Sequence, residues 1–372
     1  MLTDRKIYNE IQLRAEKKAP DHRYRRFTGI LDNMLEVLRG KIYKEIPRAA
    51  PDFDDHGEAH ADLILALCDE ILENNYLQDG GRTEVDVRWR ENRISNDELF
   101  VLTAAVLWHD AAMIDGRKDH AINLRKLQFT QMIMSTLNTL DSSLADFYCS
   151  VILNIACAHS DDKSLQSCKT VEVADGRFDS ETVSVRTKAL AGLVRLCDEL
   201  SDDRSRTNTI AMERVDKVAK IYWLHSRYIS LSEIQVSSSR NHPNTVHIVY
   251  RIPYEHLFTL YTLADGKDIY LYQFVINRIE KVHVEMTICC PLFADLTFLE
   301  KLIVEIFILG GSDNSEELQL ETIHLANAIS PITRPECWQD LSLSKLIAEY
   351  KSLCRKDVEK LAKNKFRKKK KS

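Results

Sequence analysis

Apolar residues recur with a helical period over most of the chain. Between residues 51 and 228 nearly every segment repeats its hydrophobic positions about every 3.6 residues, which predicts a series of amphipathic helices. Residues 1–50 follow the same pattern and predict a charged helical lead-in. The stretch 163–187 is polar, and we expect a loop with short irregular pieces there.

The pattern changes after Tyr228. Residues 229–236 and 245–252 flank the turn-forming sequence Asn-His-Pro-Asn and predict a β-hairpin, since apolar and polar positions alternate in the second segment. Helical spacing returns at 265–282, 315–328 and 340–364, whereas 284–310 fits either strands or a helix. The predicted fold class is mainly α, a helical bundle with a small β-hairpin and an α+β C-terminal extension. The predicted divisions are a lead-in (1–50), a helical domain (51–228), the hairpin with the extension (229–354) and a basic tail (355–372).

Composition agrees with a helix-rich fold and excludes several classes of protein. The 372 residues include only 11 Gly and 8 Pro, which disfavours turn-dense β-sandwiches and barrels. No apolar run approaches the roughly 20 residues needed to cross a bilayer, and the N-terminus lacks the apolar segment of a signal peptide. The nine cysteines include no Cys-x-x-Cys pair and are expected to be reduced core residues. We therefore expect a cytoplasmic protein without membrane contact.

Charge and short motifs narrow the function further. The basic tail holds ten Lys and Arg against two acidic residues and so carries a charge of +8. Because the whole chain has a net charge of −5, the remaining residues carry −13. A body this acidic is unsuited to general nucleic-acid binding. Neither a P-loop nor a Gly-x-Gly-x-x-Gly sequence occurs, which disfavours P-loop ATP hydrolysis and dinucleotide-dependent redox chemistry.

The candidate chemistry lies in histidines and aspartates that meet the apolar faces of separate helices. His56 and His60 are four residues apart and are predicted to share one helix face, with Asp55 as the N-cap. A capping box at Ser95–Glu98 begins a helix that ends in the doublet His109-Asp110. One further apolar stripe begins at His120, and two others end at His159 and at Asp198.

Burying these polar groups separately would cost several kcal/mol each, whereas one shared divalent cation offsets all of them. Imidazole and carboxylate together suit a transition metal such as Mn, Fe, Co, Ni or Zn better than calcium. Cationic residues close to these groups in the sequence include Arg117, Arg195 and Arg204.

The order His60, His109-Asp110, Asp198 over residues 50–252 resembles the HD superfamily of metal-dependent phosphohydrolases. The sequence motifs Asp-His-Gly-x-x-His, His-Asp-x-x-Met and Arg-Leu-x-Asp-Glu-Leu are most similar to those of the family branch found in prokaryotic conflict (antiphage) systems. Ala111-Ala112 replaces the usual Ile-Gly after the doublet, and the absence of Gly-Tyr-Pro argues against cyclic-di-GMP as substrate.

The resemblance implies an HD-type helical bundle and assigns roles by position. The implied metal ligands are His60, His109, Asp110 and Asp198, although His56 competes for the first place. Ile64 and Leu67, which follow His60 at helical spacing, favour His60. His56 would otherwise support His60 or donate a proton. His120 and His159 would bind a second ion, or act as general acids and contact phosphate. Arg117, Arg195 and Arg204 would contact the phosphates of a substrate.

The implied cofactor is a divalent metal (Mn, Fe, Co, Ni, Zn or Mg), and the implied function is phosphohydrolysis of nucleotides, first of all (deoxy)nucleoside triphosphates in antiphage defence. One alternative is a phosphodiesterase for cyclic or short oligonucleotides. Another is a non-catalytic nucleotide sensor or scaffold. The expected partners are the nucleotide substrate, further copies of the chain in a homo-oligomer and a partner protein from a defence operon.

Overall fold

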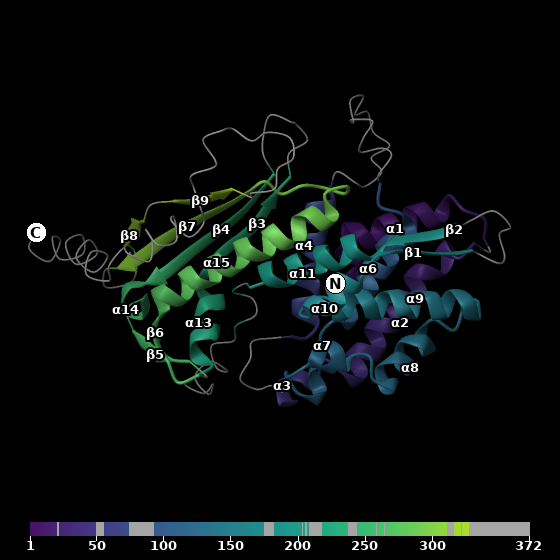
Figure 1. Ribbon diagram of the computed structural model, residues 1–372, viewed down its shortest axis with the longest axis horizontal. Helices are drawn as coiled ribbons and strands as arrows, with labels where there is room; N and C mark the ends of the chain where they lie inside the picture. The colour runs from purple at the N-terminus through teal and green to yellow at the C-terminus, as the bar shows by residue number, and fades with distance from the viewer. Residues whose placement is uncertain are drawn as a thin grey trace, which may run out of the picture. The chain divides into compact units, whose positions relative to one another are not determined.

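The computed structural model describes residues 1–20, 22–49, 56–73, 93–174, 182–202, 204, 207, 218–236, 244–257, 259–263, 265–310, 316–320 and 322–326. The chain forms two compact units (Figure 1). Unit 1 comprises Met1–Pro51, Asp55–Ser201 and Ile288–Phe298, and unit 2 comprises Asp202–Thr287 and the chain from Leu299 onward. The predicted helix over 340–364 and the basic tail lie outside the described residues.

Unit 1 is built almost entirely of helices. In chain order they are η1 (Leu2–Asp4), α1 (Lys6–Glu16), α2 (Tyr24–Lys41), α3 (Ile46–Ala49), α4 (Glu58–Leu72), α6 (Asn96–Trp108), η3 (Ala111–Asp115), α7 (His120–Asn123), α8 (Leu127–Thr136), α9 (Ser142–Cys157), α10 (Asp162–Ser167), α11 (Thr187–Leu200) and η5 (Cys290–Phe293). One short antiparallel pair, β1 (Thr170–Ala174) and β2 (Thr182–Arg186), completes the unit.

Helix α6 is the centre of unit 1. All of its residues are buried, and it packs against α1, α2, α4, α9 and α11. A helix that is apolar on every side belongs in the middle of a bundle, because no face of it can be left to water. The predicted capping box is present: Glu98 N–H donates to Ser95 Oγ, and the Glu98 carboxylate accepts from Ser95 N–H. The sequence thus begins α6 at a defined residue and ends it at the His-Asp doublet.

The lead-in is helical, as predicted, and α1 and α2 pack against each other and against α6. The expectation of a loop over 163–187 is wrong, because this stretch contains α10 and the β1–β2 pair. Val183 and Val185 of β2 are buried, whereas no residue of β1 is. Short strands that are buried on one side only give few alternating apolar positions. In a polar stretch this pattern is too weak to predict strands.

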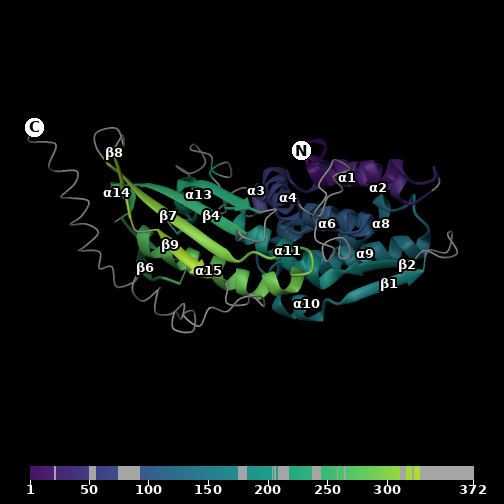
Figure 2. The ribbon, with the colours of Figure 1, turned by 90° about the horizontal axis from the view of Figure 1, so that it is seen from above.

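Unit 2 is organised around a five-stranded sheet of order β3-β4-β7-β8, in which β9 also pairs with β7. The elements are α13 (Lys220–Tyr228), β3 (Ile229–Gln235), β4 (Thr245–Pro253), α14 (Tyr254–Leu257), β5 (Leu260–Thr262), β6 (Asp268–Tyr270), α15 (Leu271–Cys289, ending in unit 1), β7 (Lys301–Gly310), β8 (Glu316–Gln319) and β9 (Ile323–Ala326). Strands β4 and β7 run parallel, and the other pairs of the sheet are antiparallel. Figures 1 and 2 show α15 running along one face of this sheet.

The structure confirms the mainly α fold with a small β part, including the β3–β4 hairpin. The ambiguous stretch 284–310 contains both the end of α15 and strand β7. The helix predicted at 265–282 begins later, at Leu271, because β6 occupies the preceding residues. The helix predicted at 315–328 is wrong, since β8 and β9 lie there. Strands of four residues are too short to distinguish their period from a helical one.

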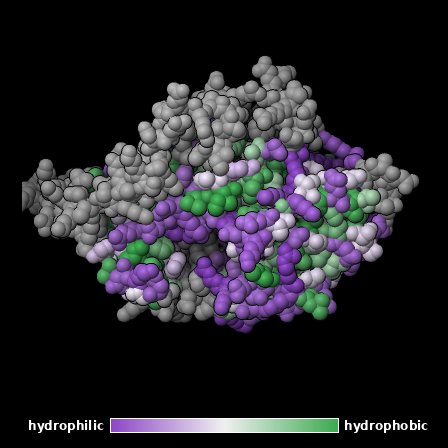
Figure 3. Space-filling model, in the orientation of Figure 1, coloured by the Kyte–Doolittle hydropathy of each residue, from purple (hydrophilic) through white to green (hydrophobic). Residues whose placement is uncertain are grey.

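The part of the surface that the structure describes carries few large apolar side chains. The coloured residues in Figure 3 are mostly hydrophilic, with separate hydrophobic patches among them. Among the described residues, the large exposed apolar side chains are Leu13, Ile122, Leu127, Leu260, Val284 and Ile288. Within the same residues, every helix is too short or too polar to cross a bilayer.

Candidate metal centre

Helix α6 delivers the doublet to the middle of unit 1. His109 is the C-cap of α6, and Asp110 is the N-cap of the short helix η3. Both side chains are buried. The chain therefore turns sharply between two helical segments, which places an imidazole and a carboxylate at one end of a fully buried helix.

Helix α4 supplies His60 in its first turn. The helix begins at Glu58 with Gly57 as its N-cap, so the prediction of Asp55 as N-cap is wrong, and Asp55 itself lies outside the described residues. Glycine is accepted at an N-cap because it takes the non-helical backbone angles required there at no steric cost. His56 thus precedes the helix instead of sharing a helical face with His60. Its side chain nevertheless approaches the Asp110 carboxylate, as the His60 side chain does.

Helix α11 supplies Asp198 two residues before its last residue, Leu200. One face of α11 is buried against α4 and α9, which fixes its rotation about its own axis. His159 lies just beyond α9. His120 is the first residue of α7 and follows Asp119, which has a left-handed backbone conformation (φ 57°). Aspartate tolerates this region better than most residues, and the turn directs His120 inward.

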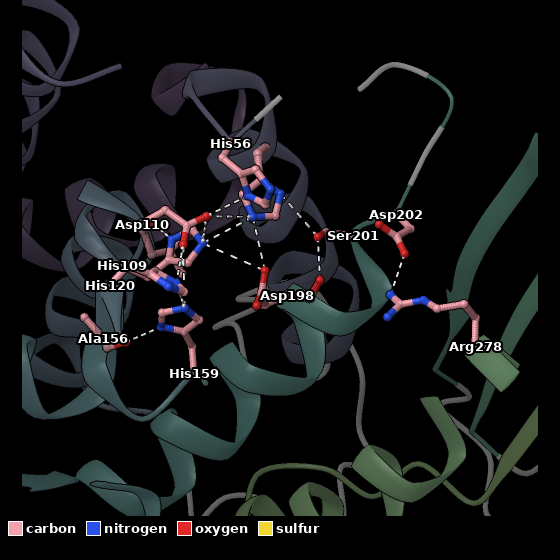
Figure 4. Close-up of polar contacts among 12 residues, drawn as sticks. His56, His109, Asp110, His120, Ala156, His159, Asp198, Ser201, Asp202 and Arg278 are labelled. Carbon is pink, nitrogen blue, oxygen red and sulfur yellow. Dashed lines mark hydrogen bonds and ion pairs between the residues drawn. The ribbon is translucent and has the colours of Figure 1, made fainter. Parts of the chain in front are cut away.

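Five histidines converge on Asp110, and Asp198 lies against two of them (Figure 4). Its Oδ2 atom lies 3.0 Å from His56 Nδ1, 3.5 Å from His60 Nε2 and 3.2 Å from His109 Nε2. Its Oδ1 atom lies 3.1 Å from His120 Nε2 and 3.6 Å from His159 Nε2. The two oxygens of one carboxylate therefore face two different sets of histidines.

Asp198 closes the first set. Its Oδ1 atom lies 3.1 Å from His60 Nε2 and 3.9 Å from His109 Nε2. Ligands of one ion bound at about 2.1 Å lie about 3.0 to 3.4 Å apart in octahedral or tetrahedral geometry. His60, His109 and Asp198 lie close enough together to hold a single divalent ion, and Asp110 Oδ2 lies within 3.5 Å of both histidines.

Hydrogen bonds fix which ring nitrogen faces the centre. Nδ1 of His109 lies 2.7 Å from Val106 O, Nδ1 of His120 2.9 Å from Arg117 O, and Nδ1 of His159 2.6 Å from Ala156 O. A carbonyl oxygen only accepts, so each Nδ1 carries the proton and donates it. Once Nε2 is deprotonated, each ring therefore presents the Nε2 lone pair to the centre, as a metal ligand must.

Two pairs of these Nε2 atoms lie very close to each other. His60 Nε2 is 3.2 Å from His109 Nε2, and His120 Nε2 is 2.9 Å from His159 Nε2. Nδ1 of both His120 and His159 already carries a proton, so their two Nε2 atoms can lie this close only with a further proton or a metal cation between them. Three residue sets could each hold an ion: His56/His60/Asp110, His60/His109/Asp198 and Asp110/His120/His159. The donors thus fit one divalent ion in each half of the cluster.

Electrostatics favour the same conclusion. Burial disfavours the charged form of Asp110 and Asp198, but the surrounding imidazoles outweigh it and hold the pKa of both carboxyls below the usual range. Burial also opposes a charged His109, yet Asp110 and Asp198 raise its pKa to about 9. Burial, aided by His109, lowers the pKa of His159 to about 4. The cluster therefore combines two ionised carboxylates with a neutral imidazole and attracts positive charge.

The predicted phosphate-binding arginines have different surroundings. Arg117 is exposed on the turn before His120. Arg195 Nη1 lies 2.6 Å from Asp162 Oδ1, and the Arg195 side chain is mostly buried. Arg204 is exposed in unit 2. Of the three, Arg117 is joined to the cluster through its own carbonyl, which accepts the His120 proton.

One residue next to the cluster has no distinctive sequence signal. Ser201 is fully buried, and its Oγ lies 3.3 Å from His60 Nδ1. A serine at the end of a helix is common, so only its position three residues after Asp198 could have indicated a role.

Comparison with known proteins assigns the domain. A profile of the HD-CE family matches residues 50–266, which include every member of the His/Asp cluster. No curated protein and no solved structure gives a significant match. HD-type domains are generally metal-dependent phosphohydrolases, and the clustered His and Asp residues could hold a divalent metal. Since the match covers more than half of the 372 residues, the chain belongs to the HD-CE family.

Proposed function

We propose that this protein is a metal-dependent phosphohydrolase that acts on nucleotides, with (deoxy)nucleoside triphosphates as substrates in antiphage defence. The observation that carries the hydrolase proposal is the Asp110 carboxylate, whose two oxygens face two sets of imidazole nitrogens. The choice of triphosphates rests on the resemblance to conflict-system proteins, since depletion of nucleotides would stop phage replication.

His60, His109 and Asp198 would hold a first ion, joined by Asp110, which lies next to both histidines, and Asp110, His120 and His159 would hold a second. A divalent ion at such a centre lowers the pKa of water and stabilises negative charge on phosphoryl oxygens. Within the chain, Asp110 then serves both halves of the site. Backbone carbonyls hold the rings of His109, His120 and His159 in the tautomer that this requires.

His56 and His120 are the more exposed histidines of the cluster. Their side chains are 16% and 15% exposed, compared with 1% for His60 and 2% for His109. Nδ1 of His56 is bonded to Asp110, which orients the ring. We assign His56 the movement of a proton at its Nε2 atom, at the edge of the cluster. Arg117, exposed beside His120, is the proposed contact for a substrate phosphate.

A nucleotide panel tests the proposal. Purified protein is stripped with a chelator, reloaded with Mn²⁺, Co²⁺, Zn²⁺, Ni²⁺, Fe²⁺ or Mg²⁺, and incubated with nucleoside triphosphates, cyclic nucleotides and short oligonucleotides before chromatography. We expect metal-dependent loss of phosphate from the triphosphates and no reaction for His109→Ala.

Other products would decide against the proposal in a defined way. Opening of a 3′–5′ linkage without triphosphate hydrolysis would identify a phosphodiesterase. Nucleotide binding without turnover under any metal, together with full activity of His109→Ala in cells, would identify a sensor or scaffold.

A further inference from the structure

Ser201 links two members of the cluster that come from different helices. It is the C-cap of α11, and it is fully buried. Its Oγ lies 2.6 Å from Asp198 O and 3.3 Å from His60 Nδ1 (Figure 4). The Ser201 backbone N–H also donates to Asp198 O. Ser201 therefore contacts the backbone of one candidate ligand and the ring of another.

The single hydroxyl proton decides the direction of both bonds. A carbonyl oxygen only accepts, so the Ser201 hydroxyl donates to Asp198 O at the shorter distance. Its oxygen lone pairs remain, and they accept the proton of His60 Nδ1. The Nε2 atom of His60 is then unprotonated and faces Asp198 Oδ1 at 3.1 Å.

This arrangement sets His60 apart from three other histidines of the cluster. His109, His120 and His159 each donate from Nδ1 to a carbonyl three residues earlier in their own segment. His60 instead contacts a hydroxyl on another helix, 141 residues away in sequence. The orientation of His60 thus depends on the C-terminal end of α11, which also carries Asp198.

We propose that Ser201 is a positioning residue that fixes the tautomer and orientation of His60 and so sets the affinity of the first metal ion. The proposal rests on the proposed function of the cluster as a metal centre. Partners of this kind, which bond the outer nitrogen of a ligating histidine, change metal affinity by about 10- to 100-fold when they are removed.

Metal affinity of three variants tests the role. Ser201→Ala removes the acceptor, Ser201→Thr keeps a hydroxyl, and Thr136→Val is the matched control. Thr136 is also buried and its hydroxyl also donates to the carbonyl three residues earlier, but it lies on α8. Mn²⁺ affinity is measured by competition with a chelator. We expect Ser201→Ala to bind Mn²⁺ about 10- to 100-fold more weakly than the wild type. The Mn²⁺ affinities of Thr136→Val and Ser201→Thr should equal that of the wild type.

The outcomes separate this proposal from the metal centre itself. Wild-type protein that binds no ion would overturn both. Wild-type protein that binds Mn²⁺, with Ser201→Ala binding equally well, would overturn the role of Ser201 alone.

A measurement on wild-type protein avoids dependence on the folding of any variant. With ¹⁵N-histidine labelling and Zn²⁺, the His60 ring is expected to show a proton on Nδ1 that exchanges slowly with water. Detection of the proton on Nε2 of His60, or of Zn²⁺ bonded to Nδ1, would contradict the proposal.

Discussion

The Nε2 atoms of His120 and His159 lie 2.9 Å apart, while the Nδ1 atom of each ring donates to a backbone carbonyl. Two neutral rings in this state would direct lone pairs at each other, which is favourable only around a shared proton or metal ion. Asp110 Oδ1 lies 3.1 Å from one of them and 3.6 Å from the other, and supplies the negative charge. This half of the cluster could therefore hold a second metal ion, beside the set formed by His60, His109 and Asp198.

The first prediction concerns the number of ions. Protein loaded with excess Mn²⁺ and then desalted should hold two ions per chain by elemental analysis, and His159→Ala should hold one. His247→Ala is the control, since His247 pairs with Glu305 on the sheet of unit 2. One ion in the wild type, unchanged in His159→Ala, would exclude the second position.

The bridging carboxylate gives a second prediction. Asp110→Asn keeps the shape of the side chain but removes the charge that both halves of the cluster share, so metal affinity should fall at least about 100-fold and hydrolysis with it. Asp115→Asn is the matched control five residues later, where the exposed carboxylate pairs with Lys126. Equal Mn²⁺ affinity of the two variants would show that Asp110 is not a ligand.

The stability of the metal-free protein should depend on pH through His109. Its pKa in the folded state, about 9, lies above the ordinary value of 6.5, because the attraction of Asp110 and Asp198 outweighs burial. The proton therefore stabilises the fold fully below pH 6.5, by up to about 3 kcal/mol, and this contribution is lost as the pH rises through 9. The pKa of His120 is also raised, so it acts in the same direction.

Thermal melting of chelated protein at pH 6.5 and pH 9 measures this loss. The melting temperature should fall towards pH 9, and His109→Asn should weaken the dependence. A divalent ion displaces the extra proton of His109, so metal affinity should rise between pH 6.5 and pH 9. The proton released on metal binding is measured by calorimetry in two buffers of different ionisation enthalpy. Chelated wild type with equal melting temperatures at both values would contradict the assignment.

A fourth prediction concerns folding alone. Asp97, at the start of α6, is buried and accepts hydrogen bonds from Arg23, Tyr24 and Tyr148. Asp97→Ala leaves the Arg23 charge buried without its partner and should cost about 3 to 5 kcal/mol of unfolding free energy. Asp62→Ala, which breaks a half-exposed pair with Arg5, should cost about 1 kcal/mol or less. Chemical denaturation compares the two, and similar costs would refute the prediction.

The parts of the fold that sequence reasoning recovers are those with long periodic signals. The apolar residues of α6 continue through the whole helix, and its capping box marks the first turn. Histidines and aspartates that end such stripes could be expected to meet, because each helix buries the same face that carries them. The β3–β4 hairpin is predictable for the same reason, since its partner strands are neighbours in sequence.

The failures occur where a signal is short or comes from distant residues. Strands β8 and β9 span four residues each and pair with β7. Strand β7 in turn pairs with β4, which begins 56 residues before β7 does. Nothing local distinguishes such strands from a helical turn. The spacing between His56 and His60 predicts one shared helix, but the helix begins after Gly57, which excludes His56. Ser201 has no local signal, because its contact with His60 exists only in the tertiary structure.

The contrast between α6 and the turn before His120 bears on how such a site can diversify. Every position of α6 is enclosed, so almost any replacement there disturbs packing and chemistry together. The turn from Gly116 to Asp119 has an exposed Arg117 and holds two residues with positive φ. Substitutions at exposed positions of this turn, such as Arg117, can therefore change the surface beside the cluster while α6, which carries the doublet, stays constant.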